Sequence, residues 1–556
     1  MTSAPFRVPL PPHGRIDAGP VPVRLSGESK EGRVMPAPDS PRTGPDRTPD
    51  PILPSEGAGG RLVPALSRRR ALQLGGLGLL GIAIGAPGWG PSAGLALAAA
   101  ESLSEPETLH SENGLLRVRL EVAETTVPLA GRQAHMLTYN GTVPGPTLRL
   151  RPGDRLQVEL VNRLTVPTNL HTHGLHVSPK GNADNTLDVH VHPGESFQYD
   201  IQLPDDHPPG PFWYHPHEHH LVADQIWSGL YGAIVVEDAG PEVPVTRDRV
   251  LVVSDTTLDD DGHPVHVSEW ERMKGREGRL VLVNGQLTPT LEARPGERER
   301  WRIINTCTSR FLKLRLDGHQ VDLLATDIGR LAEPRRVDEV EVLNSGRVDV
   351  LVTVGERTGE LEGLANPRTL GGDGPSGAPG TLATLQVSGS PVPALPPVPA
   401  YPQLPDLREV EPAARRTMVL GFDSSGGGHE DHGDGQEGHG DGDGSGGMVM
   451  TINGRPFDHA RTDEVTRLGT VEEWTYVNHT GMDHPLHLHV WPMQVVAVDG
   501  RPVEDVVYQD VVRVSAGGET TVRIPFEDFD GRTVFHCHIN DHEDAGMMAV
   551  VEARTG

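Results

Sequence analysis

Cysteine, aromatic residues and long apolar runs are all scarce in this chain. Two cysteines among 556 residues exclude the disulfide-rich scaffolds, whose small cores depend on several crosslinks. No uninterrupted apolar stretch reaches the roughly 20 residues of a membrane-spanning helix, so no membrane span is expected in the mature protein. Basic residues are outnumbered by acidic ones, 49 against 77, which argues against nucleic acid and anionic membranes as partners.

The first hundred residues differ in composition from the rest. Residues 67–100 begin with Ser67, Arg68, Arg69 and Arg70, continue as a short Gly-rich apolar segment, and end in three alanines. This pattern is typical of a twin-arginine signal with a small-residue cleavage site. It predicts an exported protein, periplasmic or extracellular. Residues 1–66 are interpreted either as a disordered N-terminal extension or as the product of an incorrectly chosen start.

An internal repeat organises the remaining chain. Each of three copies has an Asn-Gly turn, a following proline, a Gly turn and an alternating strand that ends at an asparagine. The turns lie at Asn140-Gly141, Asn284-Gly285 and Asn453-Gly454, and the strands end at Asn162, Asn305 and Asn478. Such units predict an all-β fold built of sandwiches or Greek-key barrels.

The repeat predicts three domains and one linker. These are residues 106–239, residues 240–390, a Pro-rich linker at 391–415 that is expected to be extended, and residues 416–556. Within the third domain, residues 424–447 form a Gly-, Asp- and His-rich tract that lacks the apolar residues of a core. We expect a solvated, mobile loop there. The alternative is that its histidines bind metal.

Metal-ligand residues cluster near the C-terminus, in the run His536, Cys537, His538, His542 and Met547. A blue-copper centre needs one thiolate, two imidazoles and often a weak thioether, and this run supplies three of the four. Because side chains alternate along a strand, His536 and His538 point away from Cys537 and could serve a second metal site. The alternatives are a zinc cluster, or a core cysteine beside surface histidines.

The other cysteine, Cys307, lies in an apolar segment of the middle repeat. A disulfide to Cys537 is compatible with an exported chain that has two cysteines. It would remove the thiolate that copper needs. We therefore interpret Cys307 as a small buried hydrophobic residue.

Histidines occupy equivalent positions in the two outer repeats. Nine residues after the repeat asparagine, the first and third copies carry His-x-His, whereas the middle copy carries Leu314 and Leu316. A second His-x-His pair closes each outer domain. The four pairs are His171/His173, His215/His217, His487/His489 and His536/His538. This comparison predicts metal in domains one and three and a structural role for domain two.

Four segments together resemble the signature segments of the multicopper oxidases. They are His171-Thr172-His173-Gly174, His215-Pro216-His217, His484-Pro485-Leu486-His487-Leu488-His489 and the Cys537 run, in that order. The resemblance covers about residues 106 to 556. It implies three consecutive cupredoxin-like domains and four copper ions, one of type 1, one of type 2 and two of type 3. The type 2 and type 3 ions would form a trinuclear cluster between domains one and three.

The resemblance also implies a role for each ligand. The type 1 ligands would be His484, Cys537, His542 and axial Met547, and the type 2 ligands His171 and His487. The type 3 pair would be held by His173, His215, His217, His489, His536 and His538. Other histidines, among them His190, His219 and His220, match no ligand position.

The activity implied by the resemblance couples four one-electron oxidations of a donor to the reduction of dioxygen to water. Phenols or aromatic amines, as for laccases, are the first choice of donor. A metal ion, Cu(I), Mn(II) or Fe(II), and a bilirubin-type pigment are alternatives. A copper-sequestering protein is the non-enzymatic alternative. The sequence carries no trace of an oligomeric state.

Reduction of dioxygen also requires protons, which carboxylates near the cluster could deliver. Glu543, directly after the predicted ligand His542, is the first candidate by resemblance. Asp184, in the loop after His173, is the second. The alternative for both is an ordinary surface carboxylate.

Overall fold

The computed structural model describes residues 101–240, 242–369, 377–423 and 449–556. The predicted extension, the predicted signal at 67–100 and the predicted loop at 424–447 lie outside this part of the chain. Within it, no helix is both long and apolar enough to cross a membrane.

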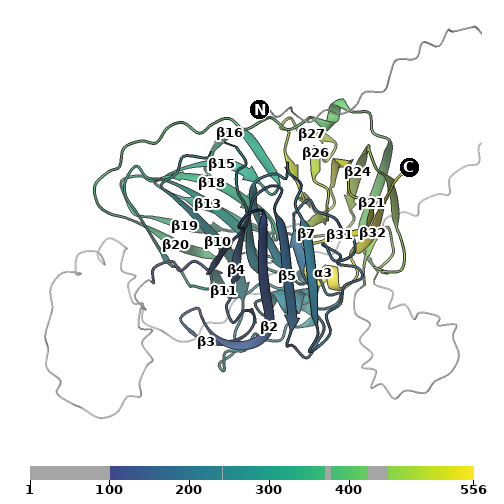
Figure 1. Cartoon of the computed structure of the whole chain (residues 1–556), viewed down its shortest axis with the longest axis horizontal. Coiled ribbons are helices and arrows are strands. Elements are labelled where there is room, and N and C mark those ends of the chain that lie inside the picture. The colour runs from purple at the N-terminus through teal and green to yellow at the C-terminus, as the bar shows by residue number, and fades with distance from the viewer. Residues whose placement is uncertain (1–100, 241, 370–376, 424–448) are drawn as a thin grey trace, which may run out of the picture. The chain divides into compact units, whose positions relative to one another are not determined.

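Strands dominate the structure, and they form six sheets that fall into three pairs along the chain (Figure 1). The first pair has the orders β1-β4-β9-β8-β6 and β3-β2-β5-β7, the middle pair β11-β10-β13-β18-β15-β16 and β12-β20-β19-β14-β17, and the third pair β22-β21-β24-β30-β26-β27 and β23-β32-β31-β25-β29. We call these pairs the first, middle and third sandwich. The all-β prediction is confirmed.

The elements have the following bounds. The first sandwich contains β1 Thr108–His110, β2 Leu115–Leu129, β3 Arg132–Tyr139, β4 Gly145–Leu150, β5 Arg155–Asn162, β6 His171–His173, β7 Ser196–Gln202, β8 Gly210–His215, α1 Val222–Trp227 and β9 Gly232–Val236. The middle sandwich contains β10 Arg247–Thr256, α2 Glu269–Lys274, β11 Leu280–Val283, β12 Thr290–Ala293, β13 Arg298–Asn305, β14 Leu312–Leu316, β15 Gln320–Thr326, β16 Gly329–Val337, β17 Val340–Val342, β18 Arg347–Thr353, β19 Gly359–Leu364 and β20 Gly380–Val387. The third sandwich contains β21 Ala414–Asp423, β22 Val449–Ile452, β23 Glu464–Arg467, β24 Thr470–Asn478, β25 His484–Leu488, β26 Met493–Val498, β27 Arg501–Pro502, β28 Tyr508–Gln509, β29 Val511–Val514, β30 Glu519–Phe526, β31 Gly531–Cys537, α3 Asn540–Asp544 and β32 Met548–Arg554.

Each sandwich has a core of its own. Leu120, Leu160 and Ile234 belong to the first core, Trp301 to the middle core and Trp474 to the third, and all are essentially inaccessible to solvent. The alternating pattern of the strands explains this arrangement, because every second side chain of β2, β5 or β24 faces the partner sheet.

The predicted Asn-Gly turns are present in all three copies. Asn140, Asn284 and Asn453 have φ angles of 54°, 51° and 54°, and the glycines that follow have φ angles of 77°, 78° and 70°. Two successive residues with positive φ make the type I′ turn that Asn-Gly favours. The repeat therefore encodes the same chain reversal in each sandwich.

The asparagine that ends the repeat strand also has one role in all three sandwiches. It terminates β5, β13 or β24, the strand that runs parallel to β2, β10 or β21 respectively. In each case the side-chain oxygen accepts a backbone N–H two residues later, and the amide nitrogen donates to nearby backbone carbonyls. In the outer sandwiches these carbonyls include those of Val166 and Met482, in the loops that lead into the His-x-His strands β6 and β25.

Replacing this asparagine tests its structural role. In Asn305→Ala, the carbonyls of Arg310, Val342 and Leu343 lose a buried donor, and the N–H of Cys307 loses its acceptor. We expect the free energy of unfolding in urea to fall by about 2–4 kcal/mol. The exposed Asn182, which makes one 3.3 Å bond, is the control, and Asn182→Ala should change it by less than about 0.5 kcal/mol. Equal effects of the two substitutions would contradict the role assigned to Asn305.

Candidate metal centres

His484, Cys537 and His542 converge in the third sandwich, and we call them the sulfur group. His484 begins β25, Cys537 ends β31, and His542 lies on α3. His484 Nδ1 lies 3.3 Å from Cys537 Sγ, His542 Nδ1 lies 3.7 Å from the same sulfur, and the two nitrogens are 3.4 Å apart. All three side chains are fully buried. These separations match ligand atoms placed around one ion at bond lengths of about 2.0–2.3 Å.

The outer nitrogens of both imidazoles in the sulfur group have partners. His484 Nε2 lies 2.7 Å from Thr480 Oγ1, and His542 Nε2 lies 3.0 Å from the backbone carbonyl of Met273 on α2. These contacts orient Nδ1 of each ring toward Cys537. Burial raises the pKa of the Cys537 thiol above its ordinary value, so a thiolate there needs a cation beside it.

Met547, the predicted axial residue, is fully buried in the same core. Its backbone carbonyl accepts the N–H of Cys537 at 3.0 Å, and its N–H donates to the carbonyl of His542 at 2.9 Å. The turn after α3 thus places Met547 next to both residues. Cys307, by contrast, is a free thiol buried in the middle sandwich, as predicted.

The other eight predicted histidine ligands form one buried group, which we call the imidazole cluster. They come from β6, from β8 and the two residues after it, from β25 and its next residue, and from β31 and its next residue. Two pairs of rings stack across the two outer sandwiches, with centroids 4.0 Å apart for His171 and His489 and 3.9 Å apart for His173 and His487. The members are His171, His173, His215, His217, His487, His489, His536 and His538.

Several imidazole nitrogens of the cluster are buried without a hydrogen-bond partner. They are His171 Nε2, His173 Nδ1, His215 Nε2, His487 Nε2, His489 Nδ1 and His538 Nε2, whereas His173 Nε2 makes no hydrogen bond but lies 3.0 Å from Asp510 Oδ2. Burial lowers the pKa of His217 to about 3 and lowers those of His487 and His538 well below the ordinary value. Neutral rings with lone pairs directed into one space fit metal ions, and buried polar atoms without such a partner are costly.

The two groups are joined through the backbone of one strand. Leu486 on β25 pairs with Cys537, and His487 pairs with His536. The Cys537 side chain belongs to the sulfur group, whereas His536 Nε2 lies 3.3 Å from His217 Nε2 and 3.2 Å from His489 Nε2. The alternation predicted for β31 therefore places Cys537 in the sulfur group on one face of the strand and His536 in the imidazole cluster on the other.

Glu543 lies directly beside the imidazole cluster. It is fully buried, with Oε1 3.2 Å from His217 Nε2 and Oε2 3.3 Å from both His536 Nδ1 and Asn540 Nδ2. Burial raises the pKa of Glu543, but His536 and His217 lower it to well below its ordinary value. Glu543 is therefore not a surface carboxylate.

Asp184 contacts a different part of the cluster. Its carboxylate lies 2.9 Å from His171 Nδ1 and accepts the N–H and hydroxyl of Thr172 at 2.8 and 3.1 Å. Its side chain is 3% exposed, so it is also not a surface group. The contact with Nδ1 leaves His171 Nε2 directed into the cluster, which gives Asp184 a positioning role at this ring.

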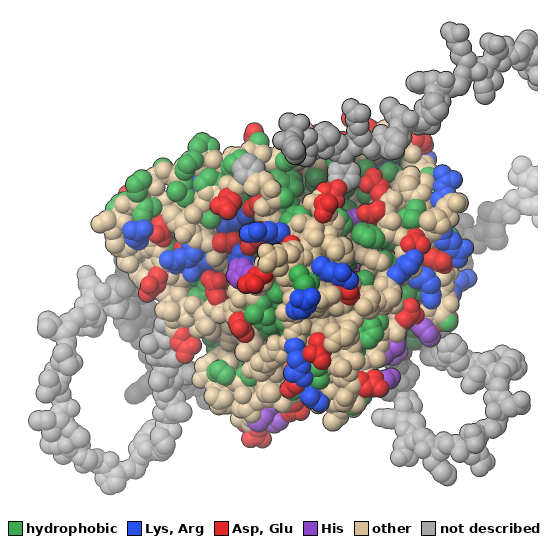
Figure 2. Space-filling view, viewed as in Figure 1, with side chains coloured by type: hydrophobic (Ala, Val, Ile, Leu, Met, Phe, Trp, Pro, Cys, Tyr) green, Lys and Arg blue, Asp and Glu red, His purple; other side chains and the backbone are tan. Residues whose placement is uncertain are grey.

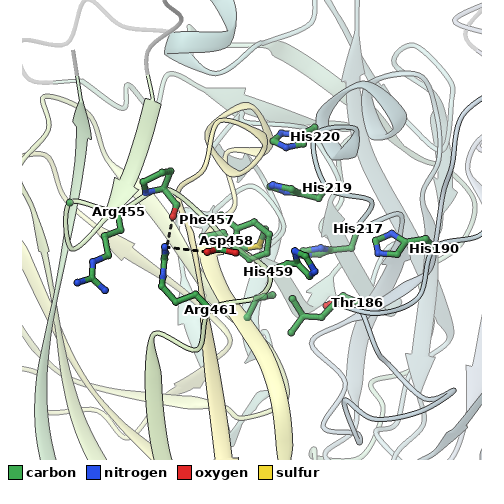
Figure 3. A pocket seen from close by; sticks show the side chains of 15 residues that line it. Thr186, His190, His217, His219, His220, Arg455, Phe457, Asp458, His459 and Arg461 are labelled. Atoms are coloured by element: carbon green, nitrogen blue, oxygen red, sulfur yellow. Dashed lines mark hydrogen bonds and ion pairs between the residues drawn. The ribbon is translucent and has the colours of Figure 1, made fainter. Parts of the chain in front are cut away.

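A pocket of about 700 Å³ reaches the cluster at His217 (Figure 3). Loop residues of the first sandwich, among them Thr186 and His190, form one wall, and Phe457 and His459 of the third sandwich form another. The lining also includes His219 and His220, which match no ligand position.

Some residues of these centres gave no signal in the sequence. Thr480 lies two residues after the repeat asparagine Asn478, and its N–H and hydroxyl both donate to the side-chain oxygen of Asn478. The position in the repeat is the one signal that could have identified Thr480. Met273 acts through a backbone carbonyl, which leaves no mark in a sequence. Asn540 contacts Glu543 and His538 Nδ1 from α3, a helix that the sequence analysis did not predict.

Sequence models of one family match most of this region. Three models described as multicopper oxidase match residues 121–241, 213–361 and 434–556. Together with the sulfur group, the imidazole cluster and the three sandwiches, these matches show that the chain belongs to the multicopper oxidases. It is therefore a copper-binding oxidoreductase that uses dioxygen and an electron donor.

Individual relatives agree with this assignment. A multicopper oxidase of Staphylococcus haemolyticus is 27% identical over 431 residues, which are 75% of this chain and 84% of that protein. A laccase of Bacillus stratosphericus is 26% identical over 477 residues, 74% of this chain and 89% of that protein. The structure of a multicopper oxidase from Campylobacter jejuni, described as a metallo-oxidase, has a TM-score of 0.71 and 28% identity, and covers 82% of this chain and 96% of that one.

Substitution of Asp184 tests its effect on His171. Asp184→Asn removes the charged acceptor of His171 Nδ1, and we expect the affinity for the copper bound at this ring to fall about 10–100-fold. Copper bound per chain is measured at a series of free copper concentrations. The exposed Asp188 of the same loop is the matched control, and Asp188→Asn should bind copper like the wild type. Identical titrations of the two variants would contradict the positioning role.

Proposed function

We propose that the two groups hold four copper ions with the ligands that the family pattern implies. The sulfur group with Met547 would hold the type 1 ion, and His171 and His487 the type 2 ion. The remaining six members of the imidazole cluster would hold the type 3 pair. The observation that carries this proposal is the set of buried imidazole nitrogens without partners, directed into one space between the outer sandwiches.

The coppers would supply one-electron redox chemistry, taking single electrons from the donor and delivering four of them to dioxygen. The chain provides a short route between the two groups, because Cys537 is covalently joined to His536 and His538. Met273 and Thr480 fix the rings of the sulfur group, so that the ligand atoms need little rearrangement when the charge changes.

Glu543 is placed to pass a proton to this cluster. Its two oxygens contact His217 and His536, and bulk water is excluded from all three side chains. The pocket that ends at His217 offers a route for dioxygen and water. Asp184 contacts a different ring of the cluster, that of His171, and is the second candidate for proton delivery.

For the donor, we propose small phenols or aromatic amines, oxidised in the manner of a laccase. The resemblance to the Bacillus stratosphericus laccase supports this choice. Acidic and basic side chains are interspersed on the face shown in Figure 2, so the charge of that face does not mark a docking place.

Metal-ion oxidation is the second candidate, and one observation favours it. Both imidazoles of the sulfur group are fully buried, and the carbonyl of Met273 covers the outer nitrogen of His542. A bulky donor therefore does not touch the imidazole of His542 directly. A small metal ion would need only a binding site on the α2 segment that covers this ring. The relative from Campylobacter jejuni is described as a metallo-oxidase.

Export by the twin-arginine route is part of the proposal. The sequence from Ser67 to Arg70 and the apolar segment after it support it. This route carries folded proteins, which suits a chain that binds its metal between domains far apart in the sequence.

Oxygen uptake by the copper-loaded protein tests the function. We expect uptake with one or more of phenols, aromatic amines, Cu(I), Mn(II), Fe(II) and bilirubin. Cys537→Ser should abolish the blue absorption and lower the turnover by at least 100-fold, because the type 1 ion loses its thiolate. No uptake with any donor at full copper occupancy would exclude an oxidase and leave copper sequestration.

Glu543→Gln tests proton delivery separately from electron entry. The amide keeps the size of the side chain but holds no transferable carboxyl proton, so we expect intact blue absorption and at least tenfold slower oxygen uptake. Glu552→Gln, at the partly exposed Glu552 of β32, is the control and should leave both unchanged. An unchanged rate in Glu543→Gln would rule out the relay.

A further inference from the structure

A fully buried arginine of the middle sandwich reaches the imidazole cluster, although this sandwich contributes no histidine to it. Arg347 begins β18, and its side chain is inaccessible to solvent. Its Nη1 and Nη2 each donate to the carboxylate of Asp510, at 2.7 Å to Oδ2 and 2.7 Å to Oδ1. This two-point contact fixes both the position and the plane of the carboxylate.

Asp510 in turn contacts ring nitrogens on both sides of the seam between the outer sandwiches. Its backbone carbonyl accepts His487 Nδ1 at 2.8 Å, and its Oδ2 lies 3.5 Å from the same nitrogen. Oδ2 also lies 3.0 Å from His173 Nε2. His173 and His487 are the stacked pair at 3.9 Å, one from each outer sandwich. One carboxylate thus contacts both members of the stack.

The remaining contacts of Arg347 hold it against the first sandwich and against its own sandwich. Nε donates to the carbonyl of Pro211 at 3.2 Å, and Nη1 lies 3.5 Å from Asp327 Oδ1. Gly174, which ends the His-Thr-His-Gly segment, leaves the space for the guanidinium, because a Cβ there would lie 2.3 Å from Nη2. The glycine of that segment is therefore required by Arg347.

The charged groups of this network are buried together. One guanidinium is shared by two carboxylates, Asp510 and Asp327, both about 2–3% exposed. The network lies against the rings of His173 and His487.

We propose that Arg347 is a positioning residue of the copper cluster, which acts through Asp510 on His173 and His487. The inference rests on the proposed function, and it extends that function to the middle sandwich. A ligand histidine usually needs a partner on its second nitrogen to hold the ring in place. Here that partner is itself held by a residue from a third part of the chain.

The test compares Arg347→Lys with a matched substitution on β13 of the same sandwich. Lysine keeps the charge but loses the two-point contact with Asp510. The control is Arg300→Lys, because Arg300 makes an equally buried contact with Asp349, with Nε–Oδ1 at 3.0 Å, and none with the cluster. Both variants are loaded with copper and examined for copper per chain, blue absorption and the electron paramagnetic resonance signal of type 2 copper.

We expect Arg347→Lys to keep the blue absorption and to need about 10–100-fold more free copper to develop the type 2 signal. Arg300→Lys should lower the midpoint of thermal unfolding but keep the wild-type copper titration. A normal type 2 signal in Arg347→Lys, with only a lower unfolding midpoint like that of the control, would show that the arginine is merely structural and would overturn the proposal.

A second variant covers the case in which Arg347→Lys does not fold. Asp510→Asn keeps the shape of the side chain and the backbone carbonyl that accepts from His487, but it removes the carboxylate charge beside His173, so it should raise the free copper needed to fill the cluster, measured as copper per chain. A wild-type titration in Asp510→Asn would overturn the proposal. Failure of the proposed function is distinguishable, since the wild-type chain itself would then bind copper only at the sulfur group.

Discussion

The structure depends on one constraint, the burial of imidazole nitrogens that have no hydrogen-bond partner in the described chain. Three histidines of the first sandwich, His171, His173 and His215, and three of the third, His487, His489 and His538, carry these nitrogens in one cluster. Neither sandwich can form this group alone, because the stacked pairs His171/His489 and His173/His487 each take one ring from either side. Copper binding in this cluster therefore requires both sandwiches in place, and bound ions would offset the cost of burying the nitrogens.

The middle sandwich has a larger part in this event than its lack of ligands implies. At the positions where the outer sandwiches carry His-x-His it has Leu314 and Leu316, both buried in its core. Its contribution comes instead from the start of β18 and the residues just before it. Asn344 donates to the carbonyl of His538, and Arg347 binds Asp510. The middle sandwich, which has no histidine ligand of its own, thus supports the ligands of the two outer sandwiches.

The same sandwich covers the sulfur group, the site of electron entry in the proposed function. Met273 on α2 accepts from His542, and Gly275 approaches Ile539 so closely that a Cβ there would lie 2.7 Å from its side chain. Arg276 joins this segment to Asp541 of α3 through several hydrogen bonds of 2.6–3.1 Å. In the proposed function, the donor would therefore meet the α2 segment before the ligands beneath it.

The sequence by itself determined the features that depend on short spacings. Strand alternation places Cys537 opposite to His536 and His538, the Asn-Gly pairs have the positive φ angles of a tight turn, and Asn162, Asn305 and Asn478 end equivalent strands. All of these follow from local backbone geometry, which a chain carries in its sequence. Tertiary structure decided the contacts between distant residues. Arg347 and Asp510 are 163 positions apart, and Met273 acts through a carbonyl that every residue has. Such contacts follow from how the sandwiches pack, and no spacing or residue type encodes them.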